Sequence, residues 1–404
     1  MHVVLVHYAA PPVVGGVEQV LGEHAKLMVE AGHRVTVVAG RGAQWDARVA
    51  YRCVPLADSR HADVVAVKAE LDLGVVSPAF HSLATRLALD MEEATAGADR
   101  VVAHNIGSLH KNLALTAAIH ELAATGAPER VVLWHHDLAW TAARYRPELH
   151  PRWPWTLLRT DWAWRHVVVS AHRRRELAVL LGIDEDTIAV VPNGVDGDRL
   201  LAISPEGAAL ASALGLAEAA PLLLMPVRLT ARKNVELAME TLAVLRRSMP
   251  AAAMVVTGPM GPHNPANLGY LERLLALRER LGLEGAAHLL ADVLDEPPSD
   301  RVVGDLYRLA DAVLFASFEE GFGIPVLEAA LARRPVFAAD IPSLRELGAA
   351  DVSWFDPSGD PGAVAASIED RLTRDPVYRL AVRARSEYTW PRIYRDRLAP
   401  VLGL

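Results

Sequence analysis

Cysteine is nearly absent from this 404-residue sequence, and its scarcity excludes several classes of protein. With Cys53 as its only cysteine, the chain has no intramolecular disulfide framework and no thiolate-based zinc or iron–sulfur cluster. Long apolar runs are missing too, since no stretch reaches the roughly 18 residues that indicate a membrane-spanning helix. The opening residues, MHVVLVHYAAPP, lack the basic region and long apolar core of a secretion signal. These absences predict a cytoplasmic protein without integral membrane segments.

Two sequence fingerprints of cofactor and metal enzymes are also absent. The glycines after the first apolar run occur as Gly15-Gly16 rather than Gly-x-Gly-x-x-Gly, which argues against a nicotinamide dehydrogenase. No HExxH motif or second clear set of histidine and carboxylate ligands occurs, so we expect neither a metal nor another cofactor. A net charge of −8 does not favour general binding to nucleic acid.

Short apolar runs rich in β-branched residues recur along the whole chain, separated by segments of helical periodicity. They lie at 2–7, 34–40, 100–105, 130–137 and 166–172 in the first half, and at 221–228, 251–259, 286–292, 312–317 and 334–340 in the second. Continuous apolar strands alternating with helices are typical of parallel sheets covered on both faces. Residues 17–32 predict the helix between the first two strands. The sequence therefore predicts an α/β protein with two Rossmann-like, doubly wound parallel-sheet domains facing a central cleft.

The alternation of strands and helices is interrupted at 197–221, which we interpret as the linker between the two domains. In open α/β sheets the ligand binds beyond the carboxyl ends of the strands. We therefore expect the loops that follow strands to contain the functional residues.

The loops of the second half combine two cations with two carboxylates. Arg228 and Lys233 follow the first strand, where both could converge on the oxygens of a diphosphate or simply solvate a loop. The stretch EEGFGIPVLEAALARRPVFAAD follows a later strand and places Glu320 and Glu328 on either side of a Gly-Phe-Gly-Ile-Pro turn. Gly321 and Gly323 permit close backbone approach, and Pro325 suits the first turn of a helix, with Glu328 near its start. Carboxylates there suit sugar hydroxyls and a ribose diol, and the intervening amides suit a phosphate.

The loops of the first half contain glycines, histidines and polar side chains. Gly15 and Gly16 precede a helix, either as a simple turn or as a close approach to an anion or sugar. Of the pair His135-His136, we expect His136 to face the cleft. The stretch HNIGSLHKN places four candidate acceptor-binding residues after a strand, or it simply begins a helix: His104, Asn105, Lys111 and Asn112.

Tryptophan is concentrated in one short span of the first half, interleaved with arginines. Six of the nine tryptophans are Trp134, Trp140, Trp153, Trp155, Trp162 and Trp164. Core packing, an aromatic wall against an acceptor sugar, and peripheral contact with a membrane surface all remain open for this span.

Several motifs, taken in order, resemble the retaining glycosyltransferases of family 4, which have the GT-B fold. They are GGVEQV near the start, HHD, VPNGVD at 191–196, RLTARKN, the pair of glutamates, and EYTWPRIYRDRLAPVL at 387–402. The resemblance implies domains at 1–197 on the acceptor side and 198–385 on the donor side, with a C-terminal helix at 386–404 returning to the first domain. It also implies transfer of a hexose from a UDP- or GDP-sugar to a hydroxyl, with retention of configuration and without a metal.

The resemblance also implies roles for individual residues. Arg228 and Lys233 would bind the donor diphosphate, Glu320 the donor sugar and Glu328 the ribose. Further donor contacts would come from Gly15, Gly16 and Asn193 and from the turn Gly321, Phe322, Gly323 and Ile324, with His136 near the transferred sugar. The acceptor would be a small molecule, a glycan or a lipid-linked intermediate. A nucleotide-sugar epimerase and a non-catalytic sugar-binding protein are the alternatives.

Overall fold

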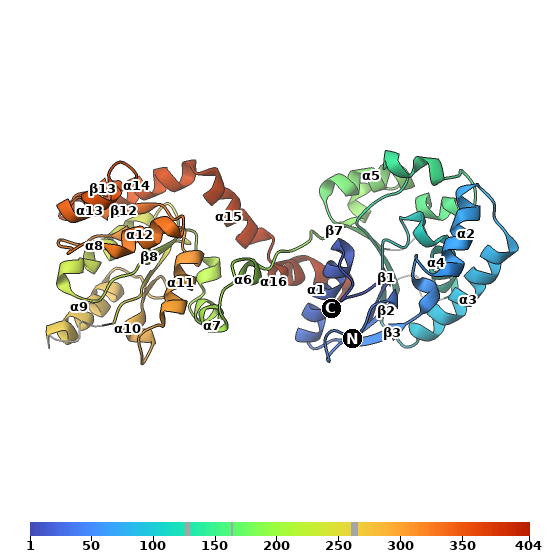
Figure 1. Ribbon diagram of the computed structural model, residues 1–404, viewed down its shortest axis with the longest axis horizontal. Helices are drawn as coiled ribbons and strands as arrows, with labels where there is room; N and C mark the ends of the chain where they lie inside the picture. Colours follow the sequence, from blue (N-terminus) through green and yellow to red (C-terminus); the bar gives the residue numbers. More distant parts are fainter. Residues whose placement is uncertain (126–129, 163–164, 260–265) are drawn as a thin grey trace. The chain divides into compact units, whose positions relative to one another are not determined.

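The computed structural model describes residues 1–125, 130–162, 165–259 and 266–404, which form two compact units (Figure 1). The first unit comprises Met1–Val195 together with Tyr388–Leu404, and the second comprises Asp196–Glu387. Each unit is built on one parallel sheet with helices on its faces. The prediction of two doubly wound α/β units is therefore confirmed.

The first unit contains seven parallel strands in the order β3-β2-β1-β4-β5-β6-β7. Their bounds are β1 His2–Ala9, β2 Arg34–Arg41, β3 Ala50–Cys53, β4 Arg100–His104, β5 Val131–His135, β6 Arg165–Val168 and β7 Ala189–Val190. The strand order reverses between β1 and β4, which are hydrogen-bonded neighbours. Ligands of doubly wound sheets bind beyond the carboxyl ends of the strands at such a reversal point.

Helices cover both faces of the first sheet, which explains why its central strands are largely apolar. The main helices are α1 Gly16–Glu30, α2 Ala62–Asp72, α3 Pro78–Ala94, α4 Leu113–Thr125 and α5 Ala171–Leu181. Successive side chains of a strand point to opposite faces. Val4 and Val6 of β1 accordingly pack in the cluster that includes α2, α3 and α4, whereas Val3 and Leu5 pack in the cluster that includes α1.

The C-terminal segment completes the first unit. Its elements are α16 Trp390–Ile393, the π-helical turn η9 Tyr394–Leu398 and α17 Ala399–Leu402. Ile393 and Leu398 join the core cluster beside α1. The amide of Val195 donates to the carbonyl of Tyr388 at 2.7 Å, so the two segments in which the chain passes between the units are hydrogen-bonded to each other.

The second unit contains six parallel strands in the order β10-β9-β8-β11-β12-β13, which reverses between β8 and β11. The strands are β8 Leu222–Met225, β9 Ala253–Val256, β10 Ala287–Leu289, β11 Ala312–Phe315, β12 Val336–Ala339 and β13 Ser353–Phe355. The helices that follow the strands are α8 Val235–Leu245, α9 Ala266–Arg280, α10 Leu290–Val293, α11 Asp300–Leu309, α12 Ile324–Leu331, α13 Pro342–Gly348, α14 Pro361–Arg374 and α15 Pro376–Glu387. The strands share one core cluster with the helices that cover them.

The interpretation of 197–221 as a linker was wrong. These residues lie in the second unit and form α6 Gly197–Leu200 and α7 Pro205–Ala213. The hydroxyl of Ser204 accepts from the first turn of α7 and donates to the buried carboxylate of Asp305 in α11 at 2.5 Å. Leu210 and Ala211 pack into the core of the second unit. The segment is rich in alanine on both its buried and its exposed face, so the alternation of apolar and polar residues that indicates a helix is weak.

Three short strands were not predicted, and two predicted runs extend into helices. β3, β7 and β13 have two to four residues and lie at the edges of the sheets, where one side has no neighbouring strand. The runs 166–172 and 286–292 include the first residues of α5 and α10. A short apolar run does not itself distinguish a strand from the start of a buried helix.

A buried ion pair connects the start of the second sheet to α15. The side chain of Asp311 is 3% exposed, and it accepts from the amide of Leu222 at 2.9 Å and from both terminal nitrogens of Arg385 at 2.9 and 2.8 Å. Removing one partner of such a pair leaves a buried group without compensation.

We predict that Asp311→Ala lowers the free energy of unfolding by about 3 kcal/mol, because it leaves Arg385 and the Leu222 amide without their acceptor. The matched control is Asp370→Ala, which removes a surface ion pair to Arg374 whose side chains are 56% and 78% exposed. That change should lower the free energy of unfolding by no more than about 0.5 kcal/mol. Urea denaturation followed by circular dichroism measures both, and equal losses would contradict the prediction.

Buried histidines are concentrated in the first unit: His7, His24, His104, His110, His135, His136 and His166. Burial is the largest cause of a lowered pKa in each of them. His24 is the clearest case, because burial lowers its pKa to about 3 and neither ring nitrogen has a hydrogen-bond partner among the described residues. Its ring packs against those of His104, Trp134 and Trp390.

We predict that acid destabilises the first unit. Between a pH near 6.5 and a pH near 3 the unfolded chain binds a proton at His24 that the folded chain does not, so stability falls as the pH falls through this range. In this range His24→Phe should therefore reduce the slope of the free energy of unfolding against pH by about 1.4 kcal/mol per pH unit. Urea midpoints from tryptophan fluorescence between pH 7 and 5 measure this, with the exposed His172→Gln as control. An unchanged slope in His24→Phe would refute the assignment.

Candidate functional site

An ion pair lies at the carboxyl ends of β8 and β11, where the strand order of the second sheet reverses. Lys233 ends the 3-10 turn η8 Ala231–Lys233 that follows β8, and its Nζ lies 2.5 Å from Oε1 of Glu320, which follows β11. The hydroxyl of Ser317 donates to the same carboxylate oxygen at 2.6 Å. The two charged side chains are 11% and 12% exposed. Two loops that are 87 residues apart in sequence thus place a cation and a carboxylate in contact.

Backbone hydrogen bonds hold the two loops together and so fix the ion pair. The amide of Phe318 donates to the carbonyl of Arg232 at 2.8 Å. Asn234 has a left-handed backbone with φ of 54°, and its side-chain amide donates to the carbonyls of Ala316 and Pro357 at 3.1 and 2.8 Å. Asn234 and Ser317 were not among the residues singled out from the sequence, although Asn234 is the residue that follows Lys233 in RLTARKN. An asparagine directly before a helix, where left-handed backbone is tolerated, is the signal that could have identified it.

The second carboxylate, Glu328, lies in α12 and is oriented by a tyrosine from α11. The hydroxyl of Tyr307 donates to Oε2 of Glu328 at 2.8 Å and lies 3.3 Å from the carbonyl of Pro325. Burial raises the pKa of Tyr307, and the negative charge of Glu328 raises it further, so the phenol remains a donor. Tyr307 is buried while Glu328 is exposed. Tyr307 could not be recognised from the sequence, because it lies on the apolar face of a helix more than 20 residues from Glu328.

The turn between the two carboxylates requires glycine at Gly323. Its φ of +100° lies in the region that favours glycine, and a Cβ there would lie 2.5 Å from Leu344. Gly323 caps α12, and Pro325 lies in the first turn of that helix as the sequence predicted. The neighbouring residues Gly321, Phe322 and Ile324 are exposed. The turn therefore presents its backbone and the amino-terminal end of α12 to solvent.

Arg228 lies in the same loop as Lys233 but differs from it in environment. Its side chain is exposed, and within the described residues its guanidinium forms no hydrogen bond or ion pair. The second unit thus brings Lys233 and Glu320 together, orients Glu328 through Tyr307, and leaves Arg228 open to solvent.

In the first unit, His136 follows β5 and lies among other buried histidines. Its Nε2 is 3.1 Å from Nδ1 of His104, and its backbone amide donates to the side-chain oxygen of Asn105 at 2.7 Å. Burial, followed by the charge of His7, lowers the pKa of His136 to about 3. At neutral pH this imidazole is uncharged, so it can donate or accept a hydrogen bond but does not act as a cation.

The four candidate acceptor residues have different environments. His104, Asn105 and Asn112 are buried, whereas Lys111 is exposed. The amide of Asn112 donates to the carbonyls of Leu56 and Ala57, and its oxygen accepts from the amide of Leu115. Asn105 has a left-handed backbone, with φ of 58°, and its oxygen holds the amides that follow β5. These contacts give both asparagines a structural role, so Lys111 is the member of the set that is open to a ligand.

Gly15, Gly16 and Asn193 lie at the ends of elements of the first unit. Gly15 caps α1 and Gly16 is its first residue, directly after the loop that follows β1. Asn193 is exposed and follows β7, two residues before the end of the first segment of this unit.

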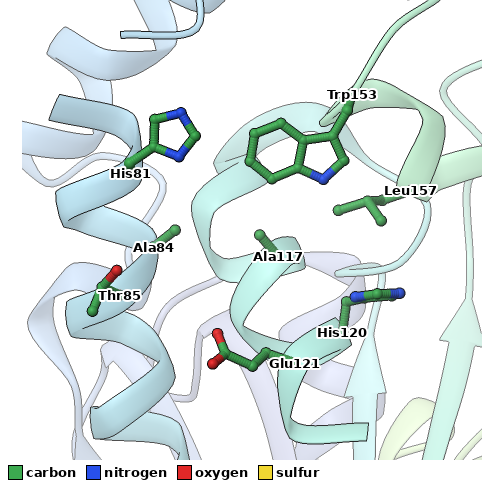
Figure 2. Close-up of a pocket in the computed structure, with 8 residues that line it drawn as sticks. All are labelled: His81, Ala84, Thr85, Ala117, His120, Glu121, Trp153 and Leu157. Atoms are coloured by element: carbon green, nitrogen blue, oxygen red, sulfur yellow. The ribbon is translucent and has the colours of Figure 1, made fainter. Parts of the chain in front are cut away.

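The tryptophan-rich span is mostly core. Trp134, Trp155 and Trp162 are buried, and Trp164 lies outside the described residues. Trp153 is 43% exposed and, as Figure 2 shows, lines a pocket of about 250 Å³ together with residues of α3 and α4. This pocket is formed by the helices that cover the sheet and includes none of the candidate site residues. In the part of the chain that the structure describes, no helix has the length and apolar character needed to cross a bilayer.

Within the described residues, no group of three or more histidine, cysteine, aspartate or glutamate side chains is arranged to hold a metal ion. The two candidate centres contain charged and hydrogen-bonding side chains: Lys233, Glu320 and Glu328 in the second unit, and Lys111 and His136 in the first.

Comparison with known proteins gives matches for both units. Residues 14–199 match the family described as Glycosyltransferase Family 4, and residues 209–386 match Glycosyl transferases group 1. A D-inositol 3-phosphate glycosyltransferase of Nocardia farcinica is 34% identical over 189 residues, which cover 45% of this chain and 38% of the relative. Its counterpart from Jonesia denitrificans is 30% identical over 239 residues, which cover 55% of this chain and 53% of the relative. The chain thus spans about half the length of these curated relatives, or less.

Among solved structures, Anabaena HepE in complex with UDP-glucose is 18% identical, with 100% of both chains covered and a TM-score of 0.36. A likeness at that level assigns no function to this chain. The family matches are more informative, because one falls on each parallel-sheet unit and together they cover most of the sequence. The chain therefore belongs to the glycosyltransferases, with a match to Glycosyltransferase Family 4 over its first unit and to Glycosyl transferases group 1 over its second.

Proposed function

We propose that this protein transfers a hexose from a UDP- or GDP-sugar to a hydroxyl group of an acceptor, with retention of configuration and without a metal. The observation that supports this most directly is the contact between Lys233 and Glu320 at the carboxyl ends of β8 and β11. It combines a cation suited to phosphate with a carboxylate suited to sugar hydroxyls, at the reversal point where doubly wound sheets bind ligands.

The diphosphate of the donor would bind to Arg228 and Lys233. Arg228 offers a planar set of donors that suits phosphate oxygens, and the ammonium of Lys233 adds a compact charge. The amino-terminal end of α12, which begins at Ile324, contributes a favourable dipole and backbone amides. These groups stabilise the negative charge that develops on the diphosphate as the bond to the sugar breaks.

The two carboxylates would bind different parts of the donor. Glu328, held by the Tyr307 hydroxyl, keeps its remaining lone pairs for the diol of the ribose. Glu320 accepts from both Lys233 and Ser317 through Oε1, which leaves Oε2 for hydroxyls of the transferred sugar.

Retention would follow from attack on the face of the sugar that the diphosphate leaves. The acceptor hydroxyl forms the new bond to the anomeric carbon as the bond to the diphosphate oxygen breaks. The leaving diphosphate takes the proton from that hydroxyl. His136, neutral at pH 7, would contribute a hydrogen bond to the transferred sugar rather than a charge.

The acceptor would be a hydroxylated molecule that also bears a negative group. Lys111 supports this assignment, because it is the exposed cation among the candidate acceptor residues. The names of the relatives, D-inositol 3-phosphate glycosyltransferases, point to the same chemistry. Glycan and lipid-linked acceptors that bear a phosphate belong to the same class, the latter with peripheral contact to a membrane from the cytoplasmic side.

The alternatives are a nucleotide-sugar epimerase of the same fold and a non-catalytic sugar-binding protein. An epimerase would convert the donor sugar without an acceptor. A binding protein would neither transfer nor hydrolyse the donor. Product analysis with and without acceptor separates the three.

We predict that one nucleotide family stabilises the protein in a thermal-shift screen of UDP, GDP and ADP and of their glucose and mannose conjugates. A ligand at 100 times its Kd should add about 2.7 kcal/mol of stability. Glu328→Ala should lose most of this shift, because it removes the ribose contact. Tyr307→Phe should weaken binding by about threefold to tenfold, because Glu328 loses the bond that orients it.

The matched control is Glu346→Ala, which removes an exposed glutamate from α13 of the same unit. It should bind the nucleotide as the wild type does. If no nucleotide shifts the wild type at millimolar concentration, the proposed donor site is wrong and the binding-protein alternative gains support.

We predict opposite effects on nucleotide binding for the two partners of the ion pair. Lys233→Ala should weaken binding by at least about tenfold, because the diphosphate loses a charged donor. Glu320→Gln should bind the nucleotide at least as tightly as the wild type, because Lys233 is then free of its carboxylate partner. Its kcat should nevertheless fall by about 100-fold, because the sugar loses a charged acceptor.

Calorimetry with the nucleotide and initial rates of sugar transfer measure the two effects. The neighbouring exposed Glu319→Gln serves as the control and should match the wild type in both. Equal kcat values for Glu319→Gln and Glu320→Gln would show that the assignment of Glu320 to the donor site is wrong.

A further inference from the structure

Glu18 lies in the first turn of α1, and its carboxylate folds back over the glycine loop that precedes the helix. A Cβ at Gly15 would lie only 2.1 Å from Oε2 of Glu18. Any larger residue at this position would therefore displace the carboxylate. The glycine that caps α1 thus has a second role, which is to leave room for Glu18 at the carboxyl edge of the first sheet.

His7, in β1, faces the carboxylate of Glu18. Its Nδ1 lies 2.9 Å from the carbonyl oxygen of His104. A carbonyl can only accept, so Nδ1 bears the proton, and the neutral ring has its lone pair on Nε2. That nitrogen lies 4.0 Å from Oε1 of Glu18. Burial lowers the pKa of His7, so the neutral ring is the form present at pH 7.

Two hydrogen-bond acceptors thus face each other without a donor between them. Among the described residues, neither the Glu18 carboxylate nor Nε2 of His7 forms a hydrogen bond, although His7 is buried and the Glu18 side chain is 17% exposed. Polar groups in such positions are normally satisfied, and leaving them unpaired is unfavourable. Their partner in the folded protein must donate a hydrogen, as water or the hydroxyl of a ligand does.

The surroundings of this pair connect it with the candidate acceptor residues. The charge of Lys111 lowers the pKa of His7, and the charge of His7 in turn lowers the pKa of His136. Lys111, His7 and His136 are therefore near enough to interact electrostatically. A molecule that placed a hydroxyl at Glu18 would therefore lie within electrostatic range of Lys111 and His136.

We propose that Glu18 and His7 form the hydroxyl-binding point of the acceptor, with the carboxylate and Nε2 accepting hydrogen bonds from a polyol. This assignment rests on the proposed function, in which the polyol is the sugar acceptor. It gives the glycine loop a role in acceptor selection, through a partly buried carboxylate that disfavours molecules without a donor at this position.

The direct test is nuclear magnetic resonance of the full-length protein with ¹⁵N-labelled histidine. The probes are myo-inositol, D-glucose, D-mannose, glycerol and myo-inositol 3-phosphate, with inorganic phosphate as the anion control. At least one polyol should shift the Nε2 resonance of His7, which is identified by its loss in His7→Phe. Glu18→Gln should either abolish that shift or raise the probe concentration needed to produce it by about tenfold.

Glu23→Gln, on the same helix, is the matched control and should respond as the wild type does. If no polyol shifts His7, or if phosphate alone produces the same shift, the assignment of a hydroxyl site is wrong. Circular dichroism tests whether Glu18→Gln is folded. If it is not, Glu18→Asp replaces it and should weaken the response, because the carboxylate is retained but withdrawn by one methylene.

Kinetics separate this proposal from the proposed function. With any polyol that accepts sugar, Glu18→Gln should raise the acceptor KM by about tenfold and leave the donor KM unchanged. A rise in the donor KM alone would overturn the assignment. If no polyol accepts sugar from any donor, the proposed function fails, while the resonance of His7 still decides whether Glu18 and His7 bind hydroxyls.

Discussion

The reversal of strand order in each parallel sheet is the constraint on which the candidate sites depend. In the first unit it lies between β1 and β4, and in the second between β8 and β11. The connections leave these neighbouring strands toward opposite faces of the sheet, so a crevice opens between the loops at their carboxyl ends. His7 and His104 in one unit, and Lys233 and Glu320 in the other, are brought together by this single topological feature.

The two units use the reversal point differently. The second unit has a fully charged contact, and short loops joined by backbone hydrogen bonds hold its cation and carboxylate at 2.5 Å. The first unit has buried imidazoles that are neutral at pH 7, since burial lowers the pKa of His136 to about 3. Charge suits a diphosphate whose negative charge grows during the reaction. Neutral donors and acceptors suit hydroxyl groups, whose hydrogen bonds depend on direction.

The sequence predicts the fold well because burial of a strand on both faces produces a simple pattern, a continuous run of apolar residues. Continuous β-branched runs such as HVVLVH occur where helices cover a strand on both sides, as they do around β1. Prediction from the sequence fails where that pattern is absent. Edge strands such as β7 are too short to form a run, and α7 is too rich in alanine to show a buried face. Glu320, in the loop after β11, and Glu328, in α12, could be singled out from the sequence because glycines and a proline mark the turn between them.

The partners of those residues were not accessible, and the reason is physical. Tyr307 contacts Glu328 only because tertiary packing brings α11 to α12, whereas Ser317 reaches Glu320 within the turn that follows β11. Neither has a local sequence pattern that distinguishes it from a core residue. Asn112 is the opposite case. As a polar residue in a loop after a strand it has the type and position of a binding residue, but its amide donates to the carbonyl of Leu56. Residue type and position after a strand thus identify which side chains could reach a ligand. Whether a side chain remains free to do so depends on the hydrogen bonds it already makes, and these belong to the folded structure alone.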